Sequence, residues 1–254
     1  MTARIIFMTG ASGGLAQAIV TRLAENDHLI LAGRSKEKLE KLYAHRPNTT
    51  CLALDLTDDA ALEEVVETIY RDFGRLDILI NNAGYGSFKA FDAYDSREVR
   101  DMFDVNTFAS MTLARLIGRK MAEQGSGHIV NIVSMAGLIA SSKSSIYAAS
   151  KFAVIGFSNA LRLELAEQGV YVTTVNPGPI ATSFFDTADP TGNYLKSVGR
   201  YVLTADQVAK KTVACLGKNK RELNLPFALA AAHKAYTLFP KTADFFARKV
   251  FNYK

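Results

Sequence analysis

Short apolar runs alternate along the chain with longer stretches in which apolar residues recur at helical spacing. The short runs predict strands at residues 4–9, 28–33, 49–55, 76–81, 128–134, 170–176 and 222–225. The longer stretches predict helices at residues 14–25, 35–44, 58–73, 96–123, 145–168 and 205–217. Strand 128–134 is almost continuously apolar, which is typical of strands buried on both faces. The pattern therefore predicts an α/β fold, a doubly wound parallel sheet of about seven strands with helices on both faces.

Two segments depart from this alternation without dividing the chain, and we expect residues 1–254 to form a single domain. Residues 178–203 lack strong periodicity. An irregular stretch of this length in a compact domain is usually a lid or a binding loop, so we expect a substrate loop there. Residues 226–254 predict a C-terminal helical extension. Its last part carries apolar residues at the i, i+3, i+4, i+7 and i+8 positions of a helix, namely Ala243, Phe246, Ala247, Val250 and Phe251.

The composition is that of an ordinary folded protein and excludes several classes. Of the 254 residues, 48% are hydrophobic and 22% are charged, which excludes a disordered chain. Cys51 and Cys215 are too few for a disulfide scaffold and favour a reducing compartment. The sequence has no signal-peptide pattern and no apolar run near ~18 residues, so we expect a cytoplasmic protein. The four histidines are scattered without ligand spacing, and we expect no metal.

The formal net charge of +5 is unevenly distributed. Residues 218–254 hold eight basic and two acidic residues, so the remaining 217 residues carry a net charge of −1. A nearly neutral body without a helix-turn-helix, finger or RNA-binding motif argues against a nucleic-acid partner. Three interpretations of the basic C-terminal segment stay open: weak contact with an anionic membrane surface, contact with a second subunit, or packing on its own domain.

The sequence TGASGGLA at residues 9–16 follows the first predicted strand and leads into a helix. Gly10 permits a sharp turn, and Gly13 and Gly14 let the backbone approach a phosphate without a Cβ in the way. The N-terminus of the following helix presents free N–H groups and the positive end of the helix dipole. The same glycines would also suit a tight turn that binds no ligand.

The residues after the second predicted strand indicate which dinucleotide would bind. Arg34 lies about 20 residues after Gly14, where an acidic residue usually holds the free 2′-hydroxyl of an adenosine ribose. Here the segment is cationic instead and contains Arg34, Ser35, Lys36 and Lys38. A guanidinium can hold a phosphate through two hydrogen bonds, so we predict NADP(H) rather than NAD(H). The alternative is that Arg34 is a solvated loop residue.

Three residues suggest proton chemistry. Tyr147 and Lys151 lie four residues apart at the start of a predicted helix and therefore share one face. A neighbouring ammonium stabilises a phenolate and lowers the tyrosine pKa, which makes the tyrosine a usable acid and base. Ser134 ends the fifth predicted strand, where its hydroxyl could position a substrate carbonyl. Each feature alone has a simpler reading, a surface pair for the first two residues and a turn for the serine.

Taken together, these motifs resemble the short-chain dehydrogenase/reductase family. The resemblance rests on TGASGGLA at 9–16, NNAG at 81–84, Asn106, Ser134, YAASK at 147–151 and NPGPIAT at 176–182. The motifs follow the family's order and spacing over about residues 4–217. They imply a Rossmann-type dinucleotide-binding domain and an NADP(H)-dependent oxidoreductase that interconverts a carbonyl and an alcohol. One position differs, because Ala16 stands at the third glycine, and the dinucleotide fingerprint tolerates alanine there.

The resemblance also implies a role for individual residues. Tyr147 would be the acid and base, Lys151 would hold the nicotinamide ribose and tune Tyr147, and Ser134 would orient the substrate oxygen. Asn106 would hold the water of a proton relay. The residues implied to bind the cofactor are Gly10, Ser12, Gly13, Gly14, Leu15, Arg34, Ser35, Lys38, Asp55, Leu56, Asn82, Ala83, Gly84, Val105, Tyr147, Lys151, Pro177, Gly178, Ile180 and Thr182.

The substrate and partners are less determined by the sequence. Six apolar residues are expected near the pocket mouth, namely Tyr85, Phe88, Leu138, Phe184, Phe185 and Tyr194. They favour a small apolar carbonyl compound or alcohol, and the alternative is that they only pack a lid. The resemblance implies a homodimer or homotetramer formed through the helices near 96–123 and 145–168. Two other functions use the same fold: a lipid-carbonyl reductase at a membrane surface, and a non-catalytic nucleotide sensor or scaffold, which would not need the proton-transfer groups.

Overall fold

The computed structural model describes residues 3–190 and 192–250 and is built around one parallel sheet. Its seven strands follow the order β3-β2-β1-β4-β5-β6-β9, and every neighbouring pair is parallel. These strands are β1 Ile5–Met8, β2 His28–Gly33, β3 Thr49–Ala53, β4 Ile78–Asn81, β5 Gly127–Ile132, β6 Val170–Pro177 and β9 Glu222–Leu225. A separate parallel pair consists of β7 (Ile180–Ala181) and β8 (Leu203–Thr204). The predicted doubly wound sheet is confirmed, since the chain extends it outward from β1 in both directions.

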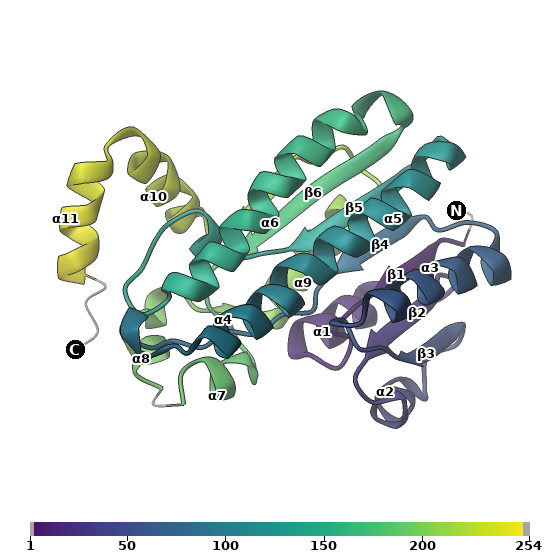
Figure 1. The fold of residues 1–254 in the computed structure, drawn as a ribbon, viewed down its shortest axis with the longest axis horizontal. Helices are drawn as coiled ribbons and strands as arrows, with labels where there is room; N and C mark the ends of the chain where they lie inside the picture. Colours follow the sequence, from purple (N-terminus) through teal and green to yellow (C-terminus); the bar gives the residue numbers. More distant parts are fainter. Residues whose placement is uncertain (1–2, 191, 251–254) are drawn as a thin grey trace.

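Helices cover both faces of the sheet, as Figure 1 shows. They are α1 Gly14–Arg22, α2 Lys36–Tyr43, α3 Asp59–Phe73, α4 Ser96–Phe103, α5 Ala109–Gln124, α6 Ser145–Glu164, α7 Phe184–Ala188, α8 Asn193–Ser197, α9 Ala205–Cys215, α10 Phe227–Leu238 and α11 Pro240–Val250. One apolar core joins the sheet to α1, α2 and α9, and a second core joins it to α3, α5 and α6. Ile6 belongs to the first core and its neighbour Phe7 to the second. Burial on both faces therefore explains the continuously apolar strands.

Local sequence signals account for several helix ends. The carboxylate of Asp58 accepts hydrogen bonds from the first turn of α3, and Gly74 ends this helix with a φ of 71° in the left-handed region. Helix α4 begins with a capping box formed by Asp95 and Glu98. Thr204 begins α9 in the same way, with its side chain accepting from the backbone of the third helical residue. Most helix boundaries consequently lie close to those expected from the sequence.

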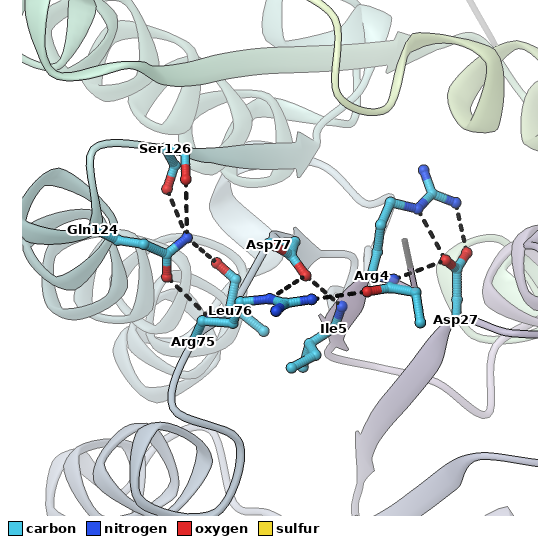
Figure 2. Close-up of polar contacts among 9 residues, drawn as sticks. Arg4, Ile5, Asp27, Arg75, Leu76, Asp77, Gln124 and Ser126 are labelled. Atoms are coloured by element: carbon cyan, nitrogen blue, oxygen red, sulfur yellow. Dashed lines mark hydrogen bonds and ion pairs between the residues drawn. The ribbon is translucent and has the colours of Figure 1, made fainter. Parts of the chain in front are cut away.

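A polar network holds the amino edge of the sheet, opposite the carboxyl ends of the strands (Figure 2). The buried carboxylate of Asp27 lies 2.5 Å from the Arg4 guanidinium, and this pair raises the pKa of Arg4. The Asp77 carboxylate accepts a hydrogen bond from the Ile5 backbone at 2.7 Å and one from the Arg75 side chain at 3.3 Å. These contacts tie the beginning of β1 to the segment before β4, so that edge has a structural role.

One predicted helix is divided in the structure. The expected helix 96–123 consists of α4, a π-helical turn at Asp104–Phe108, and α5. The turn places Asn106 in the interior, where its side chain bonds to the Tyr85 backbone and to Ser150. Periodicity did not reveal this interruption, because a single wide turn leaves the apolar spacing on either side almost unchanged.

The two irregular segments also acquire structure. Residues 178–203, expected as a loop, contain β7, α7, α8 and a short 3-10 helix at Gly199–Tyr201. The expected C-terminal extension is the hairpin of α10 and α11, which projects from the body in Figure 1. Phe251, the last member of the predicted apolar stripe, lies outside the described residues, so the direction of that stripe stays a prediction.

Two features are absent from residues 3–190 and 192–250. No helix among them is long and apolar enough to cross a membrane. The same residues contain no group of three or more His, Cys, Asp or Glu side chains placed to hold a metal ion.

Candidate active site

A cleft of about 810 Å³ lies at the carboxyl edge of the sheet. Six residues that were predicted from separate motifs line it, each just after or at the end of a different strand: Gly10, Arg34, Asp55, Asn82, Ser134 and Pro177. Open α/β sheets bind ligands at this edge, where the strand order reverses. The topology therefore brings together motifs that are separated by more than a hundred residues in the sequence.

The glycine-rich turn after β1 is held from both sides. Gly10 has a φ of 63°, and a Cβ there would stand 2.7 Å from the Ala83 Cα, so the position requires glycine. The Tyr43 hydroxyl of α2 donates to the Ala11 carbonyl at 2.5 Å. From the other side, the Asn82 amide donates to the Thr9 and Gly10 carbonyls, each at 3.1 Å. The Asn82 side chain thus braces the turn, a function that its motif alone did not reveal.

The N-terminus of α1 opens into the cleft and suits an anion. Its N-cap residue Gly13 provides no side-chain hydrogen bond, and the first turn contains no acidic residue. Gly13, Gly14 and Leu15 line the cleft. Free backbone N–H groups and the positive end of the helix dipole favour a phosphate at this position. The observed turn therefore fits the pyrophosphate of a dinucleotide.

The end of the cleft where the sequence predicts the adenosine ribose is cationic. Arg34 and Lys38 line it, and within residues 3–190 and 192–250 neither side chain forms an ion pair with a carboxylate. Ser35, predicted to bind the cofactor, does not line the cleft. Its hydroxyl caps α2 by accepting from the Lys38 backbone, and it donates to Glu37 at 2.9 Å. Asp55 lines the cleft, with its carboxylate bonded to Thr57.

The three residues predicted to take part in proton transfer line the other end of the cleft. Tyr147 and Lys151 are 6% and 5% exposed, and both line the cleft together with Ser134. The Lys151 ammonium lies 5.8 Å from the centre of the Tyr147 ring. Burial raises the pKa of Tyr147 to about 12, which differs from the lowering expected from Lys151, and a hydrogen bond with Ser134 acts against the effect of burial. Burial lowers the pKa of Lys151 to about 8.

Space around Lys151 is kept open by a glycine. A Cβ on Gly84 would stand 3.1 Å from Lys151 Nζ and 3.0 Å from Asn106 Oδ1. Among the described residues, no carboxylate forms an ion pair with Lys151, although its ammonium is buried. A buried ammonium needs hydrogen-bond acceptors, and the two hydroxyls of a ribose would supply them. This part of the cleft therefore fits the nicotinamide ribose.

Asn106 lies beside this group without lining the cleft. Its Oδ1 accepts the Tyr85 backbone N–H at 2.9 Å, and its Nδ2 donates to the Tyr85 carbonyl at 2.9 Å and to Ser150 Oγ at 3.1 Å. Both amide hydrogens are used. The side chain thus joins the segment after β4 to helix α6, which carries Tyr147 and Lys151.

Aromatic rings form the wall beside Tyr147. The Phe88 ring lies 5.6 Å from the Tyr147 ring and 5.0 Å from the Tyr194 ring. Phe184 lies 5.9 Å from Tyr147, and Phe185 stacks on Tyr194 at 5.5 Å. Tyr85, Phe88, Phe184, Phe185 and Tyr194 line the cleft as expected. Contrary to expectation, Leu138 does not line the cleft; its side chain is buried elsewhere, and its carbonyl lies 3.2 Å from His233 Nδ1 of α10.

The remaining residues that line the cleft are of two kinds, those that the sequence predicted and those that it did not. Ser12, Leu56, Ala83, Val105, Gly178, Ile180 and Thr182 line the cleft as expected. The lining residues that the sequence did not predict include Ile139, Ser141, Ser144, Thr187, Val198, Tyr201, Leu229 and Ala232. Leu229 and Ala232 come from α10 and reach the cleft only because the chain turns back after β9. No local motif marks these positions, so only the tertiary fold could identify them.

The fold and the arrangement of Ser134, Tyr147 and Lys151 indicate a nucleotide-binding α/β enzyme. Comparison with known proteins makes this specific. A model of the short chain dehydrogenase family matches residues 4–192, and the chain belongs to this family. It is accordingly an oxidoreductase that acts on CH–OH or C=O groups of small molecules, and the family uses a nicotinamide cofactor.

Individual relatives agree with this assignment. The chain is 35% identical over 194 residues to an uncharacterized oxidoreductase of Staphylococcus aureus (strain MRSA252), covering 75% of this chain and 84% of that protein. It is 34% identical over 186 residues to a 3-ketodihydrosphingosine reductase of Bacteroides thetaiotaomicron, covering 73% and 67%. A short-chain dehydrogenase from Streptomyces avermitilis superimposes with a TM-score of 0.83 at 28% identity, covering 98% and 97%. ElxO with NADP bound gives 0.82 at 25% identity, covering 91% and 100%.

Proposed function

We propose that this protein is an NADP(H)-dependent oxidoreductase that interconverts a carbonyl and an alcohol on a small apolar substrate. The observation that carries the proposal is one cleft with two chemically different ends. Arg34 and Lys38 line the end where the adenosine ribose would lie, and Tyr147, Lys151 and Ser134 line the other. A phosphate-binding turn at the N-terminus of α1 lies between these ends.

The chain's own residues account for the proton chemistry. When bound, the cofactor exchanges a hydride with the substrate carbon. The Ser134 and Tyr147 hydroxyls hold the substrate oxygen, where negative charge develops during reduction, and each such donor contributes about 3 kcal/mol. Tyr147 Oη gives its proton to that oxygen. The Lys151 ammonium favours the resulting phenolate, and the proton is replaced through Lys151 and a water near Asn106.

The aromatic wall supports an apolar substrate. Phe88, Phe184 and Tyr194 enclose the space beside Tyr147 with apolar ring surface. The Bacteroides thetaiotaomicron relative is named for the reduction of a 3-keto compound, which supports a ketone as the oxidised form of the substrate. Binding such a compound would exclude water from the substrate oxygen and thereby strengthen its hydrogen bonds.

Replacing the proposed acid tests this function directly. Tyr147→Phe keeps the ring and removes the hydroxyl, so kcat for ketone reduction is expected to fall about 1,000-fold or more while the dissociation constant for NADPH stays within a few-fold. Stopped-flow or steady-state NADPH oxidation measures the first quantity, and fluorescence titration measures the second. Tyr171 is exposed near the beginning of β6, so Tyr171→Phe is the matched control and should leave kcat and the NADPH dissociation constant unchanged. Turnover of Tyr147→Phe within tenfold of the parent would refute its role.

The cofactor preference has its own test. Arg34→Asp replaces a phosphate-binding cation with a group that repels a 2′-phosphate and can bind a free 2′-hydroxyl. We expect KM for NADPH to rise about 10- to 100-fold, with KM for NADH falling. Lys36→Asp makes the same charge change on α2 outside the cleft and serves as the control. Equal KM values for NADPH and NADH in the parent would contradict the NADP(H) assignment.

Self-association through α5 and α6 is also proposed. Phe152 and Leu163 are eleven residues apart on α6, and so lie on one helix face; they are 44% and 76% exposed. Gly156 lies between them, and a Cβ there would meet nothing within 4 Å. An apolar stripe with a small residue at its centre suits close approach of a second helix. We therefore propose a homodimer or homotetramer.

A further inference from the structure

Helix α10 has two faces with different surroundings. Leu229, His233 and Tyr236 share its inner face, and all three are partly buried. Phe227 and Leu238, eleven residues apart, belong to the opposite face together with Ala231 and Lys234, and all four are exposed. A helix on the surface of a soluble domain normally directs polar residues outward. In α10 the outward face is apolar, apart from one lysine.

The exposed apolar surface continues into the turn and α11. Phe227 is 85% exposed, Leu238 71%, Phe239 65% and Phe245 53%. Single exposed apolar residues are common, but four large ones within nineteen residues of one projecting hairpin form a surface that marks an interaction site. Figure 1 shows α10 at the side of the body and α11 farther out, away from the sheet.

The inner face connects this surface to the cleft. His233 Nδ1 lies 3.2 Å from the Leu138 carbonyl, and Gly178 approaches so closely that a Cβ there would be 2.8 Å from Leu229 Cδ1. Leu229 and Ala232 line the cleft, and Ala232 is at the same time exposed to solvent. The mouth of the cleft therefore opens beside α10, one helix width from the exposed apolar face.

The positive charge of the hairpin favours an anionic partner. Between residues 226 and 254 the sequence has five basic residues and one acidic residue, Asp244. Two of the basic residues, Lys234 and Lys241, are exposed next to the apolar surface. A two-fold contact between copies would bring this cationic surface against itself. An anionic bilayer surface offers opposite charge to the lysines and an apolar boundary to the phenylalanines.

We propose that the α10–α11 hairpin docks the protein on anionic membrane surfaces, with the outer face of α10 at the headgroup boundary. Docking brings the mouth of the cleft to the bilayer, so the substrates are lipid-like compounds with a carbonyl or hydroxyl group. The substrate class rests on the proposed oxidoreductase function, whereas the membrane docking does not. In the docked state, Lys234 and Lys241 direct their ammonium groups to lipid phosphates while their methylene groups stay on the apolar side.

Vesicle binding tests the docking independently of catalysis. The full chain is sedimented with vesicles of phosphatidylcholine alone and of phosphatidylcholine with about one third phosphatidylglycerol. We expect binding to the anionic vesicles, at least about tenfold weaker binding to the neutral ones, and loss of binding at high salt. Protein that stays in the supernatant with both compositions, or that binds both equally, overturns the proposal.

Matched variants locate the contact. Phe227→Ser with Leu238→Ser, and separately Lys234→Glu with Lys241→Glu, should each weaken binding to anionic vesicles about tenfold or more. Phe91→Ser removes an equally exposed phenylalanine outside the hairpin, and Lys210→Glu with Lys211→Glu makes the same charge change on α9, so both should bind like the parent. Sedimentation equilibrium is run on all variants. If the hairpin variants lower the oligomeric state and leave vesicle binding unchanged, the surface is a subunit contact and the proposal is wrong.

Rates of reduction of a soluble and a membrane-embedded ketone distinguish membrane docking from catalysis. A short soluble ketone and a long-chain ketone embedded in anionic vesicles are each supplied with NADPH. The hairpin variants should reduce the short ketone at the parental rate and the embedded ketone at least about tenfold more slowly. If neither ketone is reduced by the parent, the oxidoreductase proposal fails while the vesicle-binding result stands. If the variants reduce the embedded ketone at the parental rate, the delivery of lipid substrates is refuted.

Discussion

The buried His128 side chain forms two hydrogen bonds that require one particular tautomer of its ring. The Gly217 backbone N–H donates to His128 Nδ1 at 2.9 Å, so the ring proton belongs on Nε2, which lies 2.8 Å from Thr173 Oγ1. Protonation of Nδ1 would break the first bond and place an unpaired charge in the interior. Burial accordingly lowers the pKa of His128 to about 4. These contacts give His128 a structural role between β5, β6 and the turn at Gly217.

This histidine predicts acid sensitivity. Between pH 6.5 and 4 the unfolded chain binds a proton at His128 that the folded protein does not, so the free energy of unfolding falls as the pH is lowered through this range, by about 3 kcal/mol in total. Urea unfolding at pH 7 and at pH 4.5 measures the change. His128→Asn keeps an acceptor for Gly217 and should remove most of this pH dependence. His45→Asn, at an exposed position, is the control, and an unchanged slope in His128→Asn would contradict the assignment.

At the scale of elements, the cofactor site depends on how the turn after β1 is held. The turn receives hydrogen bonds from α2 and from the segment after β4, and Gly10 packs directly on Ala83. Glycine spacing predicted the turn itself. It could not predict the two braces, because these come from elements that are distant in the sequence and adjacent only in the sheet.

Gly10 and Gly74 both have a positive φ, but only Gly10 is closely packed. Comparing their alanine variants therefore separates the cost of backbone strain from the cost of a steric overlap. Gly74 has a φ of 71°, and a Cβ added there would meet nothing within 4 Å, so Gly74→Ala should lower the free energy of unfolding by about 1 kcal/mol. Gly10→Ala adds an overlap at 2.7 Å with Ala83 to the same strain and should cost about 3 kcal/mol or more. Chemical denaturation measures both, and calorimetry should show NADPH binding retained only by Gly74→Ala. Equal losses of stability would mean that the contact with Ala83 is unimportant.

At the scale of the whole molecule, the two edges of the sheet differ: one is held by polar contacts, and the other forms the cleft. Its amino edge is held by the Arg4–Asp27 pair and by Asp77, and its carboxyl edge forms the cleft. Helices α3, α5 and α6 pack on one face, and α6 also presents the exposed stripe of Phe152 and Leu163. The proposed membrane contact is on the α10–α11 hairpin, and the proposed subunit contact is on α6, so the two proposals concern different elements.

A charge in the stripe tests self-association. Phe152→Glu places a carboxylate at the proposed helix contact, where burial without a partner is unfavourable, so the oligomer is expected to dissociate to monomers. Sedimentation velocity measures the state directly. Phe91→Glu, at an 80% exposed position outside α5 and α6, is the control and should retain the parental state. A parent that sediments as a monomer would refute the proposed homo-oligomer.

The sequence by itself determined the doubly wound sheet and most of the residues that line its carboxyl edge. Strand burial leaves continuous apolar runs, and the turn, the Tyr147–Lys151 spacing and Ser134 are local patterns that one segment carries alone. The tertiary structure decided what depends on segments meeting: the π-helical turn at Asn106, the braces on Gly10, the position of Ser35 outside the cleft, and the wall formed by α10. Such contacts join residues far apart in the chain, and their energy depends on shape after folding, which periodicity and motif spacing do not encode.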